Sequence, residues 1–434
     1  MLGQAWKEIG IKPAKECAGG SKEGICWVTA SQNPVTARRS HAGIGHYAAV
    51  LPRANYDILV RHQAVRVVYA KEVTAGPPLV EVRSRADGSL FNLTAKAEVI
   101  IAAGALHTPT VLQRSGIGPA SFLKTAAIPI VLDLPGVGSN LQDHSGPPVI
   151  FNYTNPPAFF PTPPDMLNAT FKADAIAGFN ETPARGPYTL SLGSSAVYVS
   201  LPHMNPKYAA IVARIRKMAA DGSAASYLAP EYRSIPAMVA GYNSQLLALA
   251  DLLANPEAPS LESPWATSMA PLTTWSFLLH PLSRGTVRLN LTDPLTQPIL
   301  DYRMGSNPVD FDIHSSGVRF LRRLLDTPAL KKYGVTEISP GAAVAQNDTA
   351  LVEYIKDQVI LSFQHPCCTA PMLPKNKGGV VGPDLKVHGA AGLRVVDMSV
   401  VSLIPGSHLS ATAYAIGEKV CLLRLLDGSE STDM

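Results

Sequence analysis

The sequence predicts a mixed α/β chain, α+β overall, in which two domains are interleaved. Its 434 residues exceed the length of a typical single domain and are enough to bury a substantial core. Residues 97–104 read as a short buried strand that ends in small residues, and Thr108 and Pro109 supply an N-cap and a first-turn proline for a following helix. Apolar Val287 and Leu289 alternate with polar neighbours, as in a half-buried strand.

The remaining elements follow from local patterns. Residues 1–10 have the pattern of an amphipathic helix, and the helix after Thr108 should end at 115–118, where glycines permit a left-handed cap. Proline and aromatic residues at 146–164 indicate a loop-rich crossing between domains. Further strands are expected at 56–60, 64–69, 359–361 and 392–397, a loop or helix at 43–48, and a closing helix from Ser410 or Ala411.

Composition excludes several classes of protein. The chain has 37 basic and 33 acidic residues, a formal net charge of +4, and no long basic run, so nucleic acid is not an expected partner. No apolar stretch reaches the length of a membrane span, and no signal peptide is visible at Met1. No cysteine and histidine cluster has zinc spacing, so no metal is assigned.

Asparagines and cysteines indicate the compartment. Six Asn-x-Thr sequons favour a secreted glycoprotein or one of the secretory pathway. Cys17 and Cys26 are close enough in sequence to bridge a small loop, although five cysteines neither prove nor exclude an oxidising compartment. The sequons lie at Asn92, Asn152, Asn168, Asn180, Asn290 and Asn347.

Two histidines on turns near the C-terminus carry the functional signal. His365 stands in Gln-His-Pro-Cys-Cys-Thr, and His408 stands in Ile-Pro-Gly-Ser-His-Leu-Ser. Imidazole is suited to acid–base work near neutral pH. Between the two turns, an apolar strand is closed by Asp397 and small residues, which is the local chemistry of a nucleotide-binding edge.

This C-terminal region resembles the signature of the glucose-methanol-choline (GMC) family of FAD-dependent oxidoreductases. The similar stretches are 365–369, 379–387, 392–399, 405–408 and 417–419, and further similarity occurs at 97–118, 134–144 and 281–289. The resemblance implies FAD as cofactor, a small-molecule alcohol as substrate, and oxygen or a quinone as electron acceptor. It implies catalytic roles for His365 and His408, and cofactor binding by Val65, Ala103, Gly104, Asp397, Met398 and Leu409.

The family begins with a strand and a Gly-x-Gly-x-x-Gly turn, and this chain contains no such turn. We therefore expect a fragment that has lost the first Rossmann unit and that purifies without stoichiometric FAD. The expected fold is an incomplete FAD-binding Rossmann-like domain interleaved with an antiparallel-sheet substrate domain. The expected segments are a partial substrate-domain segment at 1–35, the FAD domain at 36–145, the substrate domain at 146–356, and the FAD domain again at 357–434.

The implied reaction is oxidation of an alcohol, with the hydride passing to flavin and the hydroxyl proton to His365. His408 would bond the same hydroxyl or stabilise negative charge, and the closing helix would direct its N-terminus at the flavin. Phe159, Phe160, Trp275 and Phe277 are candidates for an apolar pocket, with core packing the commoner role for each. Two alternatives stay open: a non-redox cyclase or lyase on the same fold, and an inactive remnant. A serine hydrolase is disfavoured because the chain has no Gly-x-Ser-x-Gly elbow.

Overall fold

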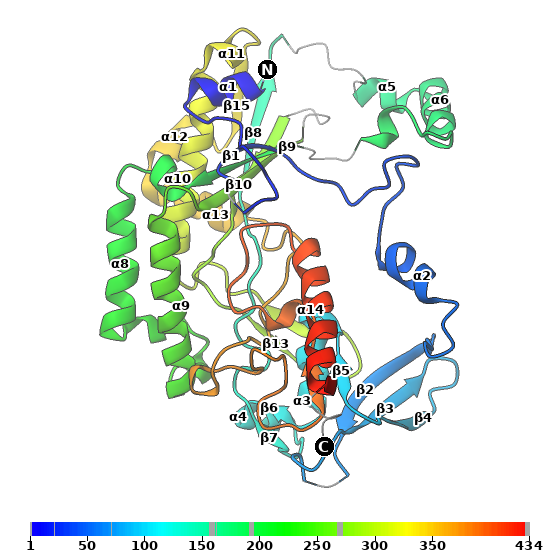
Figure 1. Cartoon of the computed structure of the whole chain (residues 1–434). Coiled ribbons are helices and arrows are strands. Elements are labelled where there is room, and N and C mark those ends of the chain that lie inside the picture. Colours follow the sequence, from blue (N-terminus) through cyan, green and yellow to red (C-terminus); the bar gives the residue numbers. More distant parts are fainter. Residues whose placement is uncertain are drawn as a thin grey trace.

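A computed structural model describes residues 2–20, 22–70, 72–155, 161, 163–190, 195–266 and 272–429. The chain is mixed α/β, as predicted. Figure 1 shows a large sheet with helices at one end and a group of smaller sheets at the other, with the closing helix α14 (Ser410–Ser429) between them.

The large sheet is antiparallel and joins segments from most of the chain. Its order is β1-β9-β10-β11-β8-β15, and the short strand β12 pairs with β10. The strands are β1 (Gly24–Trp27), β8 (Pro148–Tyr153), β9 (Ser195–Ser200), β10 (Pro259–Ala266), β11 (Leu272–Trp275), β12 (Phe277–Leu278) and β15 (Val335–Ser339).

Helices bury this sheet and form the larger core with it. In α8 (Tyr208–Asp221), the buried residues Val212, Ile215 and Met218 recur every three residues, as on one face of a helix. Figure 1 shows α8 beside α9 (Pro236–Ala254). The other helices of this part are α1 (Leu2–Glu8), α7 (Leu201–Met204), α10 (Val309–Arg322), α11 (Pro328–Lys331), α12 (Ala342–Gln346) and α13 (Asp348–Gln358).

The smaller sheets hold the strand–turn–helix that the sequence predicted. β5 (Val99–Ile101) pairs in parallel with β16 (Leu393–Val395), so segments almost 300 residues apart lie side by side. α3 (Gly104–Arg114) leaves β5 directly. The other strands are β2 (His62–Val68), β3 (Leu79–Ser84), β4 (Leu90–Thr94), β6 (Ile117–Gly118), β7 (Leu132–Asp133), β13 (Thr286–Arg288) and β14 (Ile299–Asp301).

Short helices complete the described chain. They are a π-helix (Gly43–Tyr47), α2 (Ala48–Val50), α4 (Ala120–Thr125), α5 (Pro163–Leu167), α6 (Ala169–Phe179) and 3-10 turns at Pro187–Thr189, Ser223–Tyr227, Pro230–Tyr232, Arg323–Asp326, Lys375–Lys377 and Met398–Val400. The π-helix and α2 confirm the loop or helix expected at 43–48.

Several local predictions are confirmed. α1 lies within residues 1–10, and α14 begins at Ser410. α3 ends before Ser115, and Gly116 takes the left-handed conformation with φ of 74°. A side chain at Gly116 would also collide with the Pro129 carbonyl oxygen, 2.2 Å from an added Cβ.

Four local predictions are wrong. Residues 56–60 form no strand, and their apolar side chains are exposed. Residues 359–361 contribute only an isolated bridge from Ile360 to Gly146. The expected loop at 146–164 contains strand β8, which tolerates Pro148 because this residue stands first, where its missing N–H costs no ladder bond; residues 156–160 and 162 lie outside the described chain. α3 starts at Gly104 with Ala103 as N-cap, so Pro109 lies inside the helix.

Candidate active site

A cavity of about 1870 Å³ lies where the two histidine turns meet the large sheet. It exceeds the usual volume of a small-ligand pocket, about 300–1,000 Å³, and so has room for a nucleotide cofactor together with a substrate. Its walls come from residues 17–39, the start of α3, the segment after β16, and the turns at 363–366 and 403–411. Both His365 and His408 line it.

The turn that carries His365 is fixed by a buried carboxylate. Asp143 Oδ1 accepts hydrogen bonds from the backbone N–H groups of Phe363 (3.2 Å) and His365 (3.1 Å), and Ser362 Oγ donates to Oδ2 at 2.6 Å. Burial raises the pKa of Asp143 to about 6, opposed by these hydrogen bonds. Gln364 has a φ of 61°, which an L-residue adopts only where its surroundings enforce it.

His365 has a second histidine behind it. His144 Nδ1 lies 2.9 Å from His365 Nδ1, a distance at which one of these nitrogens carries the hydrogen and the other accepts it. His144 is fully buried, and its pKa lies well below the usual value because of burial and the nearby histidines. His365 Nε2 makes no hydrogen bond to a protein atom among the described residues, so this nitrogen is free for a ligand.

The turn that carries His408 is fitted closely to its neighbours. An added Cβ at Gly406 would stand 2.9 Å from His280 Nε2, so only glycine fits without a shift. His280 in turn hydrogen-bonds the Ile404 carbonyl through Nδ1 at 3.2 Å. His408 Nε2 lies 2.8 Å from Glu262 Oε1, and the Glu262 side chain is 1% exposed. Glu262 belongs to β10 of the large sheet.

The two histidine rings lie beside each other, and both contact the ring of Phe363. Their ring centroids are 4.8 Å apart, and the edges of both rings meet Phe363. Phe363 stacks on Phe277 with centroids 4.0 Å apart. The rings therefore share one face of the cavity, and their separation lets both reach a single small group.

The surroundings push the two histidines toward opposite protonation states. Burial and, to a smaller extent, the nearby His408 lower the pKa of His365 to about 4. The hydrogen bond that His408 donates to the Glu262 carboxylate raises the pKa of His408 above its usual value, against the effect of burial. At neutral pH, His365 is neutral and can accept a proton, whereas the surroundings of His408 shift that ring toward the charged form.

A second wall has the features of a nucleotide-binding edge. Asp397 Oδ2 accepts hydrogen bonds from Gly104 N (3.0 Å) and Thr108 Oγ1 (2.5 Å), which ties β16 to the first turn of α3. Gly104 has a φ of 80°, and an added Cβ there would meet no atom within 4 Å, so its backbone faces open space. The N-terminus of α14 at Ser410 opens onto the same cavity.

Most of the predicted site residues meet at this cavity. Gly104, Asp397, Met398 and Leu409 line it together with the two histidines. Ala103 stands next to the lining as the N-cap of α3 but is not part of it. Val65 is buried in β2, outside the lining, where its carbonyl accepts a hydrogen bond from Arg114.

Of the aromatic residues proposed from the sequence for an apolar pocket, the described ones are not found in the lining of the cavity. Trp275 and Phe277 do not line the cavity; Phe277 is 1% exposed and supports Phe363 from behind, so their role is packing. Phe159 and Phe160 lie outside the described residues.

Sequence reasoning missed Asp143, Phe363 and Glu262 as members of the site. Asp143 and His144 end a stretch that resembles the family, and this resemblance could have identified them as members of the site. Phe363 stands two residues before His365. Glu262 had only the weak signal of one acid within a strand-like segment.

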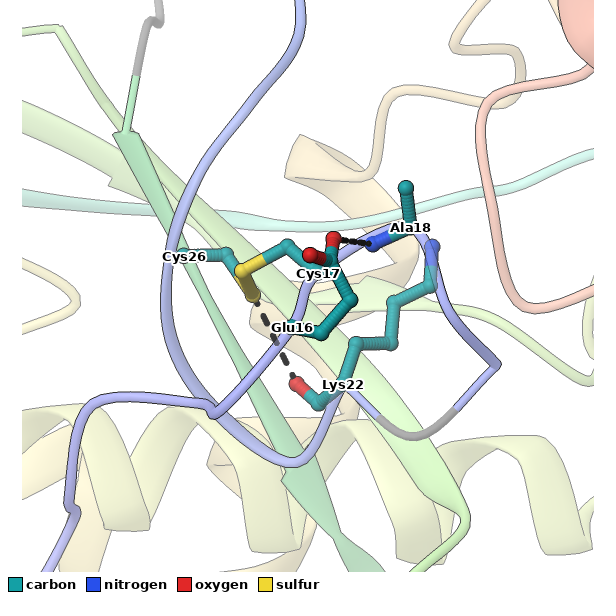
Figure 2. Close-up of a disulfide and its surroundings, with 5 residues drawn as sticks. All are labelled: Glu16, Cys17, Ala18, Lys22 and Cys26. Carbon is teal, nitrogen blue, oxygen red and sulfur yellow. Dashed lines mark hydrogen bonds between the residues drawn. A yellow bond between two sulfur atoms is a disulfide. The ribbon is translucent and has the colours of Figure 1, made fainter.

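A disulfide forms part of the cavity wall. Cys17 and Cys26 are bonded, as the sequence suggested, and Figure 2 shows Lys22 on the loop between them. Trp27 follows the bridge and also lines the cavity. Cys367 and Cys368 are free and buried in a small apolar cluster with Met398.

The described ranges hold neither a metal-ligand cluster nor a membrane-spanning helix. In these ranges, no group of three or more histidine, cysteine, aspartate or glutamate side chains is arranged to hold a metal ion. Likewise, no helix there is long and apolar enough to cross a membrane.

Comparisons with known proteins agree with this geometry. Two family models described as GMC oxidoreductase match residues 1–146 and 281–417. A solved structure described as a new fungal aryl-alcohol oxidase is 68% identical, with a TM-score of 0.97, over 99% of this chain and 70% of that one. An FAD-dependent oxidoreductase from Chaetomium thermophilum is 34% identical, with a TM-score of 0.90, over 98% of this chain and 71% of that one.

A curated relative points the same way. Dehydrogenase xptC of Emericella nidulans is 34% identical over 418 residues, which are 96% of this chain. The match spans 65% of the length of that dehydrogenase. The chain belongs to the GMC oxidoreductase family, and the predicted resemblance is confirmed.

Proposed function

We propose that the protein oxidises CH–OH groups of small-molecule alcohols with FAD as cofactor, and that aromatic alcohols are the preferred class. The main support is the pair His365 and His408, which face each other in one cavity with different protonation preferences. The similarity to a fungal aryl-alcohol oxidase supports the aromatic class.

The family and its FAD-dependent neighbour indicate FAD, and the residues present fit it. Open backbone at Gly104, the Asp397 carboxylate and the N-terminus of α14 are the groups that nucleotide cofactors use in α/β proteins. Met398 and Leu409 would add apolar contacts. FAD, when bound, supplies the acceptor for the hydride that leaves the carbinol carbon.

The hydrogen bonds around His365 indicate how it acts as the base. If His365 Nδ1–H donates to His144 Nδ1, then Nε2 of His365 carries the lone pair. His144 then carries its hydrogen on Nε2, which is buried and has no hydrogen-bond partner among the described residues, although the nearby Pro405 carbonyl raises the pKa of this ring. This tautomer lets His365 Nε2 take the hydroxyl proton as the hydride leaves.

His408 has the complementary task. With its charged form favoured by Glu262, which accepts from Nε2–H, it offers its Nδ1–H to the oxygen of the reacting hydroxyl. A cation beside that oxygen stabilises the negative charge that develops as the proton moves to His365. Phe363 keeps one side of both rings away from water.

The strand pairing supports the domain division that the sequence suggested, except that β13 and β14 within 146–356 pair outside the large sheet. β1 and β8 to β12 share one sheet, in keeping with 1–35 and 146–356 as substrate-domain segments. β5 and β16 pair in parallel, in keeping with 36–145 and 357–434 as parts of the FAD domain.

Oxygen or a quinone is the proposed electron acceptor.

We propose that the protein is secreted, because of its exposed sequon asparagines and its disulfide. Five of the six sequon asparagines are exposed, Asn290 being half-buried, and the Cys17–Cys26 bridge is of a kind that persists in oxidising compartments. Expression through a secretory host followed by endoglycosidase digestion should lower the apparent mass. An unchanged mass would contradict the proposal.

The proposed function is tested by anaerobic mixing of the FAD-loaded protein with a panel of aromatic, aliphatic and polyketide-like alcohols. We expect aromatic alcohols to bleach the flavin absorbance, which then recovers on admission of oxygen or a quinone. If no alcohol bleaches the flavin while a ring-closing or lyase substrate is consumed with the flavin still oxidised, the non-redox alternative replaces this function. If neither reaction occurs, the inactive-remnant alternative stands.

A further inference from the structure

Lys22 places a cationic side chain on the wall of the cavity, beside the large sheet. It lies on the loop that the Cys17–Cys26 disulfide closes (Figure 2), and it is part of the cavity lining. Its Nζ lies 4.7 Å from the centroid of the Tyr198 ring, within cation–π distance. The disulfide and this contact restrict a side chain that is otherwise long and flexible, so its charge is in place before a ligand enters.

This cation has no carboxylate partner in the described chain. Lys22 is half-buried, yet its Nζ makes no ion pair and no hydrogen bond with a described residue. Burial lowers the pKa of Lys22, and the Glu262 carboxylate opposes this effect. Taking an ammonium group partly out of water is costly unless an anion balances it. The protein itself therefore leaves this charge only partly compensated.

The register of the large sheet brings this cation close to the histidine pair. Tyr198, which Lys22 contacts, is paired across the strands with Glu262, and Glu262 Oε1 lies 2.8 Å from His408 Nε2. The charge of Lys22 also acts at His408, where it opposes the charged form of the ring. Lys22 and His408 line the cavity, whereas Glu262 lies behind the lining. One carboxylate is thus shared by two basic side chains that face the ligand.

The other titratable side chains of the described lining do not cancel this charge. Arg39 and Glu257 are exposed, so solvent screens them. Asp397 accepts hydrogen bonds from the first turn of α3, on the nucleotide-binding wall. His280 and His365 are uncharged at neutral pH, because burial lowers the pKa of each to about 4. A ligand with an anionic group would supply the missing balance.

Resting on the proposed function, we propose that Lys22 determines specificity by binding a carboxylate on the ring of the substrate, so that the site prefers aromatic alcohols that carry such a group. In this pose, the carbinol end lies between the two histidines. The carboxylate at the far end of the ring accepts hydrogen bonds from Nζ, which has three hydrogens to donate. A charge-assisted hydrogen bond of this kind changes affinity by about 10- to 100-fold.

The first test measures binding without turnover. The ligand p-toluate has the ring and the carboxylate but no hydroxyl to oxidise, and p-toluamide is its uncharged counterpart. In isothermal titration calorimetry of the FAD-loaded protein, the wild type should bind p-toluate more tightly than p-toluamide. Lys22→Gln should weaken p-toluate binding by about 10- to 100-fold and change p-toluamide binding little. Lys22→Arg keeps the charge and should retain most of the preference for the carboxylate.

Lys15→Gln is the matched control, because Lys15 is an exposed lysine of the same segment that does not belong to the cavity lining. It removes the same charge and should leave both affinities unchanged. Equal affinities of the wild type for p-toluate and p-toluamide, a result that needs no variant to fold, would overturn the proposal. An equal loss of affinity for both ligands in Lys22→Gln would overturn it as well, because that result indicates a structural role.

The second test connects the carboxylate site to the reaction. We compare anaerobic flavin reduction by p-(hydroxymethyl)benzoate and by p-(hydroxymethyl)benzamide, and the ratio of their second-order rate constants should fall by about 10- to 100-fold in Lys22→Gln. If neither alcohol reduces the flavin but p-toluate binding depends on Lys22, the proposed function fails and the carboxylate site stands. If both alcohols reduce the flavin with a ratio that Lys22→Gln leaves unchanged, the proposed function stands and the role of Lys22 fails.

Discussion

The surroundings of His365 and of His408 differ although the rings are 4.8 Å apart. His365 stands on a turn held by Asp143 and contacts the buried ring of His144, so its environment resists charge. His408 stands on a glycine turn and contacts the Glu262 carboxylate, so its environment attracts a proton. Two identical side chains acquire different chemistry because different elements stand behind them.

The variant expected to have the largest effect on flavin reduction is His365→Ala. Loss of the proton acceptor should slow anaerobic flavin reduction by about 10²- to 10⁴-fold, the usual worth of a positioned base. Stopped-flow absorbance of the FAD-loaded protein measures the rate. His41→Ala, at an exposed histidine, is the control and should be unaffected. An unchanged rate in His365→Ala would remove His365 from this role.

A smaller effect is expected from His144→Phe. The phenyl ring fills the space but offers no nitrogen to His365 Nδ1, so His365 loses the contact that sets its tautomer. We expect flavin reduction to slow by about 10- to 100-fold, similar to the loss of other groups that orient a reactive histidine. His314→Phe alters another fully buried histidine and controls for packing. Equal rates in the two variants would show that His144 does not set the tautomer.

The smallest expected effect is on the free energy of unfolding. Its change with pH has opposite signs for the two histidines. The pKa of His365 in the folded state, about 4, lies below the value of about 6.5 in the unfolded chain. Its contribution to stability is therefore present above pH 6.5 and is lost as the pH falls toward 4. The raised pKa of His408 gives a contribution that is present below pH 6.5 and is lost as the pH rises.

Urea unfolding from pH 4 to 8 measures both contributions. His365→Ala should flatten the acid slope by up to about 1.4 kcal/mol per pH unit, and His408→Asn should reduce the loss of stability above pH 6.5. His280 retains part of the acid sensitivity in both variants, because burial lowers its pKa to about 4 as well. Asp143, with its pKa raised to about 6, opposes this slope in every variant. Identical slopes in wild type and His365→Ala would contradict the assigned protonation state of His365.

Local chemistry made part of this structure predictable. The strand, the small-residue turn and the helix at 97–118 are encoded by consecutive residues. The end of α3, two residues before Gly116, follows from the conformational freedom of that glycine. The histidine turns and Asp397 could be named because their motifs are contiguous. Their assembly around one cavity followed from the family resemblance rather than from any single stretch.

The remaining features depend on partners distant in sequence. Residues 56–60 are apolar enough for a strand but have no paired neighbour among the described strands, and β8 is a strand because β11 and β15 flank it. Glu262 lies 146 residues from His408, and nothing local indicates that its strand ends up beside that turn. A lone acid in a strand becomes recognisable as functional only when its partner is known.

Trp27 gives the cavity an optical property. Its indole is 78% exposed where it lines the cavity, next to the disulfide loop, whereas the indole of Trp6 is 1% exposed in the core. Indole fluorescence shifts to longer wavelength in contact with water, so the two rings emit differently. A molecule that covers Trp27 therefore shifts the emission of this indole to shorter wavelength, against the emission of the three other tryptophans of the chain.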